Sequence, residues 1–298
     1  MTAPIELDDA ALRAWPLPRP SHDDDKEARG RVLVIAGSAE MPGAAVLAGE
    51  AALRAGAGKL VVATAAAVAL WVAQQLPEAR VVALPEDGDG GLHPGGPDRL
   101  ATTLEHTAAL LVGPGMAEGA STVRLVQALL GRLKALQKGQ PVLLDAAAMD
   151  VVRQPSDHGW PFGGPVGMTP HAGEMAHLSG EAKESIESDP GERARVAART
   201  WGASVALKGA CTWLAAPDGR LWRHARGNPG LATSGSGDVL AGLVAGLMAR
   251  GAPVEQALAW GVALHARAAE RLAARIGPLG FLARELSAEV PSLMAALA

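Results

Sequence analysis

The stretch "RVLVIAGSAEMPGAAVLAGEAALRAGAGKLVVAT" (31–64) contains the pattern that decides the fold. Its first part, "RVLVIAG" (31–37), is a continuous apolar run ending in glycine, which indicates a buried strand followed by a turn. The next part, "GAAVLAGEAALRAGAG" (43–58), predicts a helix closed by glycines, and "KLVVAT" (59–64) predicts a second strand. Because the apolar runs are continuous rather than alternating, both strands are predicted to be buried on both faces of a largely parallel sheet.

The same alternation of short apolar runs and longer helical segments continues along the chain. Further strands are predicted at 79–85, 108–115, 141–146, 165–171 and 204–209. Further helices are predicted at 66–76, 119–136, 192–201, 237–250, 254–276 and 279–297. Between them, "TWLAAPDGRLWRH" (212–224) has two short runs around Pro217-Asp218-Gly219 and predicts a hairpin.

Together these elements predict an α/β fold with a mostly parallel central β-sheet and helices on both faces. No internal repeat is found and no linker separates two cores, so residues 1–298 are predicted to form a single domain. Within it, residues 1–28 are described as a polar N-terminal extension. The loops 86–98 and 153–165 are rich in glycine and proline and are predicted to be surface excursions.

The composition excludes several classes of protein. Of the 298 residues, 49% are hydrophobic and 19% are charged, which suits a large packed core and not a disordered chain. The net charge of −4 and the pI near 6.1 argue against a partner that is a nucleic acid or a membrane surface. A single cysteine, Cys211, excludes an intrachain disulfide and a cysteine-rich metal site. Without a signal-peptide or membrane-spanning run, the protein is predicted to be soluble and cytoplasmic.

A second stretch, "GNPGLATSGSGDVLAG" (227–242), has glycines at 227, 230, 235 and 237 immediately before a predicted helix. Such glycines allow several backbone N–H groups to converge on one anion, and the helix dipole adds positive potential. Asp238 falls on the first helical turn, where a carboxylate also serves as a simple helix cap. A helix cap needs only one residue and does not explain four glycines, each of which costs conformational entropy when the loop is ordered. The glycines therefore favour an anion-binding site. Gly242 and Gly246, one turn apart inside the helix, are predicted to be packing residues.

Six blocks of the chain resemble, in order, the ADP-dependent NAD(P)H-hydrate dehydratases of the ribokinase-like superfamily. The blocks span nearly all of residues 26–270 and are 31–64, "LLVGPG", "PVLLDAAAMD", "MTPHAGEMAHLSG", "ALKGACT" and "GNPGLATSGSGDVLAG". The resemblance implies a ribokinase-like fold and an enzyme that restores NADH and NADPH from their hydrates. ADP would drive the dehydration and yield AMP and phosphate, with Mg²⁺ as cofactor. The resemblance also implies a homo-oligomer, a tetramer by analogy with relatives.

The resemblance also implies roles for single residues. Asp238 is implied to be the catalytic base for the hydroxyl that receives the phosphoryl group, and to contact the substrate. The implied nucleotide-binding residues are Lys208, Gly209, Ala210, Cys211, Thr212, Gly235 and Gly237. The implied contacts to the hydrated cofactor are Ala45, Gly113, Gly115 and His171.

The chain departs from the family pattern at three places. Ser234 replaces the first glycine of the G-G that precedes T-G-D, and Ala172 replaces a proline after His171. Acids on both sides of Lys26 blur the S-H-K-G pattern, which weakens the case for a phosphate contact by that lysine. The metal ligands are not assigned, and Asp145, at the end of "PVLLD", is a secondary candidate for contact with magnesium or its waters.

Two other functions stay open from the sequence alone. One is an ATP-dependent small-molecule kinase of the same superfamily, of a hydroxymethylpyrimidine or hydroxyethylthiazole type. The other is a non-catalytic nucleotide-binding sensor, which Asp238 disfavours because nucleotide binding does not require the acid. By residue type alone, Lys208 also fits a solvated strand end and His171 a structural loop histidine.

Overall fold

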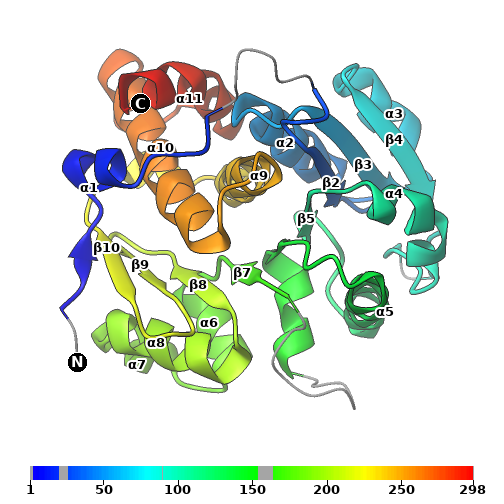
Figure 1. Cartoon of the computed structure of the whole chain (residues 1–298), viewed down its shortest axis with the longest axis horizontal. Coiled ribbons are helices and arrows are strands. Elements are labelled where there is room, and N and C mark those ends of the chain that lie inside the picture. The colour runs from blue at the N-terminus through cyan, green and yellow to red at the C-terminus, as the bar shows by residue number, and fades with distance from the viewer. Residues whose placement is uncertain (1–2, 20–25, 89, 154–163, 298) are drawn as a thin grey trace.

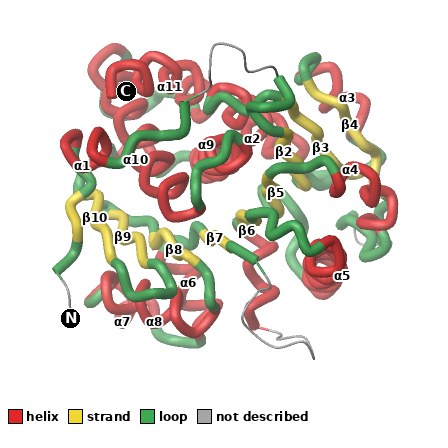
Figure 2. The backbone as a smooth tube through the Cα atoms, viewed as in Figure 1, coloured by secondary structure: helices red, strands yellow, loops and turns green. Residues whose placement is uncertain are grey.

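The computed structural model describes residues 3–19, 26–88, 90–153 and 164–297, and its central feature is one sheet of ten strands. The strands lie in the order β1-β10-β9-β8-β7-β6-β5-β2-β3-β4 (Figures 1 and 2). Their bounds are β1 Ile5–Glu6, β2 Arg31–Ile35, β3 Lys59–Ala65, β4 Ala79–Leu84, β5 Ala109–Val112, β6 Val142–Leu144, β7 Val166–Met168, β8 Ser204–Leu207, β9 Thr212–Ala215 and β10 Leu221–His224. Most of the predicted loop 153–165 falls outside the described residues.

Strand directions confirm the mostly parallel sheet. All neighbouring pairs are parallel except β8–β9 and β9–β10, which are antiparallel. The predicted hairpin at 212–224 is therefore confirmed as β9 and β10. At the centre, Val34 of β2 pairs with Val62 of β3 and Leu111 of β5, and all three side chains are buried. Burial on both faces explains why these strands read as continuous apolar runs.

Helices cover both faces of the sheet, as predicted. One face packs against α2 (Pro42–Arg54), α3 (Ala69–Gln75), α9 (Ser236–Ala249), α10 (Val254–Arg275) and α11 (Ala283–Leu297). The other face packs against α4 (Ala101–Glu105), α5 (Ala120–Leu136), α6 (Ala172–Ser179), α7 (Lys183–Ser188) and α8 (Pro190–Trp201), with the 3₁₀ turns η1 (Gly96–Leu100) and η2 (Ala146–Arg153). Figure 1 shows α9 enclosed among α2, α10 and the sheet. No helix in the described ranges is long and apolar enough to cross a membrane.

The glycines inside α9 allow it to approach α2 closely. A Cβ atom added at Gly242 would overlap the main-chain carbonyl of Ala48, and one at Gly246 would overlap that of Ala52. Both partners lie on α2, so the two helices touch along their backbones. The prediction that these glycines are packing residues is confirmed. This contact fixes the position of α9, whose first turn reaches the sheet edge where the candidate site lies.

The N-terminal segment supplies more to the fold than its description as a polar extension suggests. β1 pairs with β10, and α1 (Asp9–Ala14) buries Leu12 in the core cluster that also includes residues of α10 and α11. Trp15 stacks on Trp222 of β10, with ring centroids 5.7 Å apart. The carbonyl of Trp15 accepts a hydrogen bond of 2.8 Å from the indole N–H of Trp260. Residues 3–19 are thus bound both to the sheet edge and to α10.

Candidate active site at the carboxyl edge of the sheet

A cavity of about 850 Å³ lies where β6, β7 and β8 end and α9 begins. Parallel strands bring their carboxyl ends to one edge of a sheet, so loops from distant parts of the chain meet there. The predicted residues that line this cavity are Asp145, His171, Lys208, Gly209, Ala210, Thr212, Gly235, Gly237 and Asp238, and Glu174, which is not among the predicted residues, lines it too. The structure therefore gathers most of the expected nucleotide site around one space.

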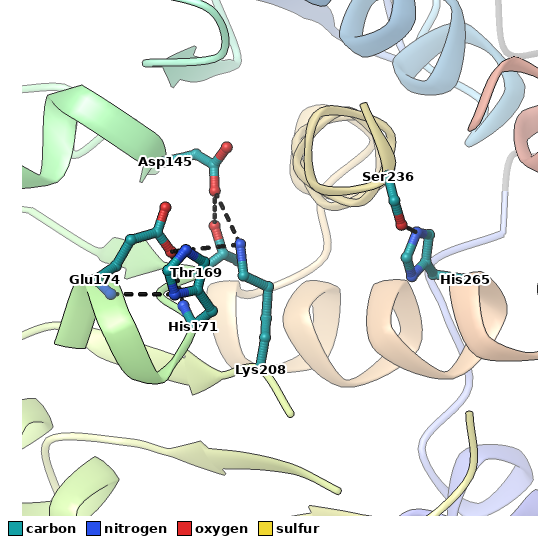
Figure 3. Close-up of polar contacts among 7 residues, drawn as sticks. All are labelled: Asp145, Thr169, His171, Glu174, Lys208, Ser236 and His265. Carbon is teal, nitrogen blue, oxygen red and sulfur yellow. Dashed lines mark hydrogen bonds and ion pairs between the residues drawn. The ribbon is translucent and has the colours of Figure 1, made fainter. Parts of the chain in front are cut away.

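Lys208 is the central cation of the cavity. It directly follows β8, and its ammonium nitrogen lies 3.8 Å from Oδ1 of Asp145 and 3.7 Å from Oε2 of Glu174 (Figure 3). A Cβ atom at Gly237 would lie 3.6 Å from the same nitrogen, so the side chain also reaches the first turn of α9. Its side chain is only 22% exposed, which does not fit the interpretation as a solvated strand end.

Asp145 is a buried carboxylate at the end of β6. The Thr169 hydroxyl, in the loop after β7, donates a hydrogen bond of 2.6 Å to its Oδ1. Burial raises the pKa of Asp145, while Lys208 and the Thr169 hydroxyl act in the opposite direction. Three neighbouring strand ends therefore combine to place one acid, one hydroxyl and one cation within hydrogen-bonding or ion-pairing reach.

Asp238 lies in the first turn of α9, as predicted, but its acidity differs from the expected value. We expect an unperturbed pKa of about 4 from the sequence, with the helix N-terminus favouring the ionised form. In the structure, burial raises the pKa of Asp238 to about 7, with a further increase from the negative charge of Asp145 and a partial offset from Lys208. The expectation is wrong because it counts only the helix and not the burial or the second carboxylate.

His171 has a structural role and also borders the cavity. It is the N-cap of α6, where its Nδ1 accepts a hydrogen bond of 3.1 Å from the main-chain N–H of Glu174. The Glu174 carboxylate in turn accepts one of 2.7 Å from the main-chain N–H of His171. Ala172, which replaces the family's proline, is the first residue of this helix. The capping box orients Glu174 toward Lys208, and a substrate contact by His171 stays a prediction.

Four predicted residues do not line this cavity. Ala45 is fully buried on α2, and Gly113 packs against the main chain of Asp145, where a Cβ atom would overlap the carbonyl. A Cβ atom at Gly115 would lie 2.7 Å from the carbonyl oxygen of Met41, just before α2. Both glycines follow β5 and lie along the same sheet edge. The fourth, Cys211, is only half-buried, and its Sγ lies 3.3 Å from Nε of Arg223.

Lys26 lies away from this site. It lines a separate cavity with Arg31 and Lys59, the first residues of β2 and β3. That cavity is therefore at the amino ends of the strands, opposite the edge that holds Asp238. A phosphate contact by Lys26 at the candidate active site is not supported.

Several residues that line the cavity or, like Thr169, contact a lining residue are not identified by reasoning from the sequence. Thr169 and Ser236 lie inside quoted blocks, where their hydroxyls carry no distinguishing pattern. His265 lies on α10, in an apolar helical run far from the glycine loop in sequence, yet it borders the same cavity. Other lining residues of this kind are His224, Arg226 and Asn228. Only the three-dimensional arrangement links them to the site.

The acids of the cavity fit a magnesium ion that is shared with a phosphate ligand. Among the described residues, no three His, Cys, Asp or Glu side chains are grouped so that they could hold a metal ion. Mg²⁺ commonly binds through one or two carboxylates together with waters and substrate phosphates. Asp145 and Asp238 repel each other strongly enough to raise the Asp238 pKa, and a divalent cation relieves such an excess of negative charge.

Comparisons with known proteins place this geometry in a family context. A family model described as NAD(P)H-hydrate dehydratase matches residues 32–292. An ADP-dependent (S)-NAD(P)H-hydrate dehydratase of Xanthomonas campestris is 48% identical, over 96% of this chain and 94% of its own length. An ADP/ATP-dependent NAD(P)H-hydrate dehydratase of Bacillus subtilis, co-crystallised with ATP and Mg²⁺, superposes with a TM-score of 0.83 at 30% identity, covering 100% of both chains. A ribokinase-like superfamily protein of Enterococcus faecalis gives a TM-score of 0.80 at 26% identity, over 99% of this chain and 96% of its own. The predicted ribokinase-like fold is confirmed.

Proposed function

The chain belongs to the NAD(P)H-hydrate dehydratase family, and from this premise we propose that it dehydrates the hydrates of NADH and NADPH at the expense of ADP. The products are NADH or NADPH, AMP and phosphate. The observation that carries the proposal is the position of Lys208, between the acids Asp145 and Glu174 and the first turn of α9. A cation in this place can hold a phosphoryl group beside Asp238.

The proposed reaction begins with phosphoryl transfer. The hydroxyl oxygen of the hydrate attacks the terminal phosphorus of ADP, and AMP leaves. Asp238 accepts the hydroxyl proton as the new P–O bond forms, while Lys208 and the N–H groups at the start of α9 hold the phosphoryl oxygens. The C–O bond then breaks and phosphate leaves with the former hydroxyl oxygen. Loss of a proton from the neighbouring ring carbon restores the double bond of the nicotinamide ring.

The raised pKa of Asp238 suits this role. A carboxylate with an ordinary pKa is a weak base, whereas one that titrates near neutral pH combines sufficient ionisation with greater basicity. Burial is the main cause of the increase to about 7, and burial also keeps water from competing for the phosphoryl group. General-base assistance typically contributes about 10²–10⁴-fold to the rate.

Mg²⁺ is the cofactor proposed for this site. Asp145 would hold it, directly or through water, together with the phosphates of ADP. When bound, the ion neutralises negative charge on the phosphates. The hydroxyl of Thr169 orients Asp145 for this contact, because it occupies Oδ1 of that carboxylate.

The remaining predicted residues are assigned to the two substrates. We propose that Gly209, Ala210, Thr212, Gly235 and Gly237 contact ADP, since they line the cavity beside Lys208. Cys211 does not line the cavity, and we propose a nucleotide contact for it because it lies in the same segment, between Ala210 and Thr212. His171 is proposed to contact the hydrated cofactor, together with the neighbouring sheet edge formed by Gly113, Gly115 and Ala45.

The decisive experiment supplies purified protein with hydrated NADH, Mg²⁺ and either ADP or ATP. The expected result is recovery of the absorbance of the reduced nicotinamide, with AMP and phosphate formed in equal amounts when ADP is supplied. An enzyme that restores nothing, but transfers phosphate from ATP to a hydroxymethylpyrimidine or hydroxyethylthiazole, would instead be a kinase. A protein that binds ADP and does neither reaction would be a sensor.

The proposal includes the setting in which the enzyme works. We propose a single domain over residues 1–298, a homotetramer and a cytoplasmic location. Light scattering coupled to size-exclusion chromatography measures the number of subunits. A single cooperative unfolding transition is the expected behaviour of a single domain, and two separated transitions would contradict it.

A further inference from the structure

A buried histidine on α10 contacts the first turn of α9. Nε2 of His265 lies 3.1 Å from Oγ of Ser236, which is the first residue of α9 (Figure 3). Both side chains are buried and both border the active-site cavity. Ser236 stands between Gly235 and Gly237 and is followed closely by Asp238, so this contact lies within the proposed phosphate-binding turn.

The turn lacks the usual means of fixing a helix start. The N-cap of α9 is Gly235, whose φ of 86° is left-handed and which has no side chain to accept a hydrogen bond from the turn. The N–H of Ser236 bonds to the carbonyl of Thr233 at 3.3 Å, and within the described residues no main-chain partner is found for the N–H groups of Gly237 and Asp238, which leaves these two for a ligand. Flanking glycines make the same segment conformationally permissive. The bond between Ser236 and His265 ties this otherwise uncapped turn to a neighbouring helix.

We infer that His265 is a positioning residue that acts through Ser236. By holding this hydroxyl, it keeps the N–H groups of the turn directed at the terminal phosphate of ADP and keeps Asp238 beside the reacting hydroxyl. The inference rests on the proposed function for the identity of that phosphate. It adds a residue on α10 to a site that the glycine loop and Lys208 otherwise define.

The electrostatic state of His265 agrees with a positioning role. Burial, with a smaller contribution from Lys208, lowers its pKa to about 4, although a hydrogen bond with the main chain of Ser236 acts in the other direction. At neutral pH the ring is therefore uncharged, with one donor and one acceptor nitrogen. A neutral ring can pair with a hydroxyl without adding charge to the anion site.

The test compares ADP with AMP, because these two nucleotides differ by the phosphate that the turn is proposed to hold. His265→Leu removes the hydrogen bond at similar volume, and Ser236→Ala removes the partner. Calorimetry is expected to show ADP affinity reduced roughly tenfold in each variant, the loss typical of a hydrogen bond at a buried site. AMP affinity should stay within about twofold, and the double variant should be no weaker than the weaker single variant.

Leu264→Ala is the matched control, because Leu264 is a buried neighbour on the same helix. It should lower the melting temperature without changing the preference for ADP over AMP. The inference is overturned if the His265 variant behaves like this control, or if the losses in the double variant add. Because the comparison measures binding, it remains informative if the protein proves to be a kinase. Failure of the wild-type protein to restore hydrated NADH would count only against the proposed function.

Discussion

Replacing Asp238 with asparagine separates catalysis from helix capping. Asparagine keeps the size of the side chain and most of its capping ability but cannot accept the hydroxyl proton. We expect Asp238→Asn to lower turnover by at least about a hundredfold, the lower limit for loss of a general base. ADP affinity should change little, because Lys208 and the main-chain N–H groups of α9 remain.

The same substitution is expected to stabilise the protein above neutral pH. An increase of the Asp238 pKa from 3.8 to about 7 means that the folded state disfavours the carboxylate. At about 1.4 kcal/mol per pKa unit, the upper limit of this penalty is about 4 kcal/mol. Asp238 is partly exposed and its repulsion with Asp145 is shared between the two groups. Both facts reduce the expected increase in the free energy of unfolding for Asp238→Asn to roughly 1–3 kcal/mol.

The sign of the effect follows from proton binding. Between pH 4 and 7 the folded protein holds a proton on Asp238 that the unfolded chain has released, so stability falls as pH rises through this range. Above pH 7 the penalty is complete, and below pH 4 it disappears. The gain in melting temperature for Asp238→Asn should therefore be larger at pH 8 than at pH 5.

The assay follows the absorbance of reduced nicotinamide at saturating ADP, with calorimetric melting of both proteins at the two pH values. Near-normal turnover in the asparagine variant would refute the catalytic role and leave Asp238 as a cap. An equal change of melting temperature at pH 5 and pH 8 would refute the argument that burial raises its pKa.

Four further outcomes are expected. In the wild type, kcat should increase about tenfold per pH unit below pH 7 and level off above it, since the ionised form of Asp238 acts as the base; a flat profile from pH 5 to 8 would contradict this. Lys208→Ala should weaken ADP binding by about 10–100-fold, the value of one charge-assisted hydrogen bond, and should move the pH profile upward because Lys208 lowers the Asp238 pKa; an unchanged dissociation constant would make it a solvated side chain. Gly242→Ala should lower the urea midpoint strongly because the new Cβ overlaps Ala48, whereas Gly131→Ala, whose Cβ meets nothing, should leave it equal or higher, and similar midpoints would refute the close helix contact. Removal of Mg²⁺ with EDTA should abolish turnover reversibly and leave the melting temperature unchanged, because no three-ligand cluster is found among the described residues; a large drop in melting temperature would indicate a structural metal.

The central strands could be predicted because each is marked by a pattern in its own short stretch of sequence. The runs that became β2, β3 and β5 are apolar without alternation, which requires burial on both faces. The predicted ends of β2 and β5 extend too far, because the residues after Ile35 and Val112 leave the sheet. The strand predicted at 141–146 ends at Leu144, and Ala146 has a left-handed φ of 46°. In contrast, β1 has only two residues and pairs with a distant strand, so no local pattern indicates it.

The site could be predicted in part for the same reason. Lys208 and Asp238 stand at a strand end and a helix start, which are positions that a sequence pattern reveals. The pKa of Asp238 could not be predicted, because it depends mainly on burial and then on the charge of Asp145, which approaches from another strand. The contact between His265 and Ser236 joins two helices whose relative position is fixed by packing. Such pairs leave no periodicity in the sequence.

Because residues 3–19 attach to β10 and α10, they can form their native contacts only after those distant elements have been synthesised. Arg223 and Glu6, which pair across β1 and β10, are 217 residues apart, and Trp260 and Trp15 are 245 residues apart. At a translation rate of about 5–20 residues per second, the first strand waits roughly 10–45 s for its partner to be made. During this interval Trp15 lacks its native contacts with Trp222 and Trp260. Residues 5–15 therefore leave the ribosome long before the residues of β10 and α10 that supply their native contacts.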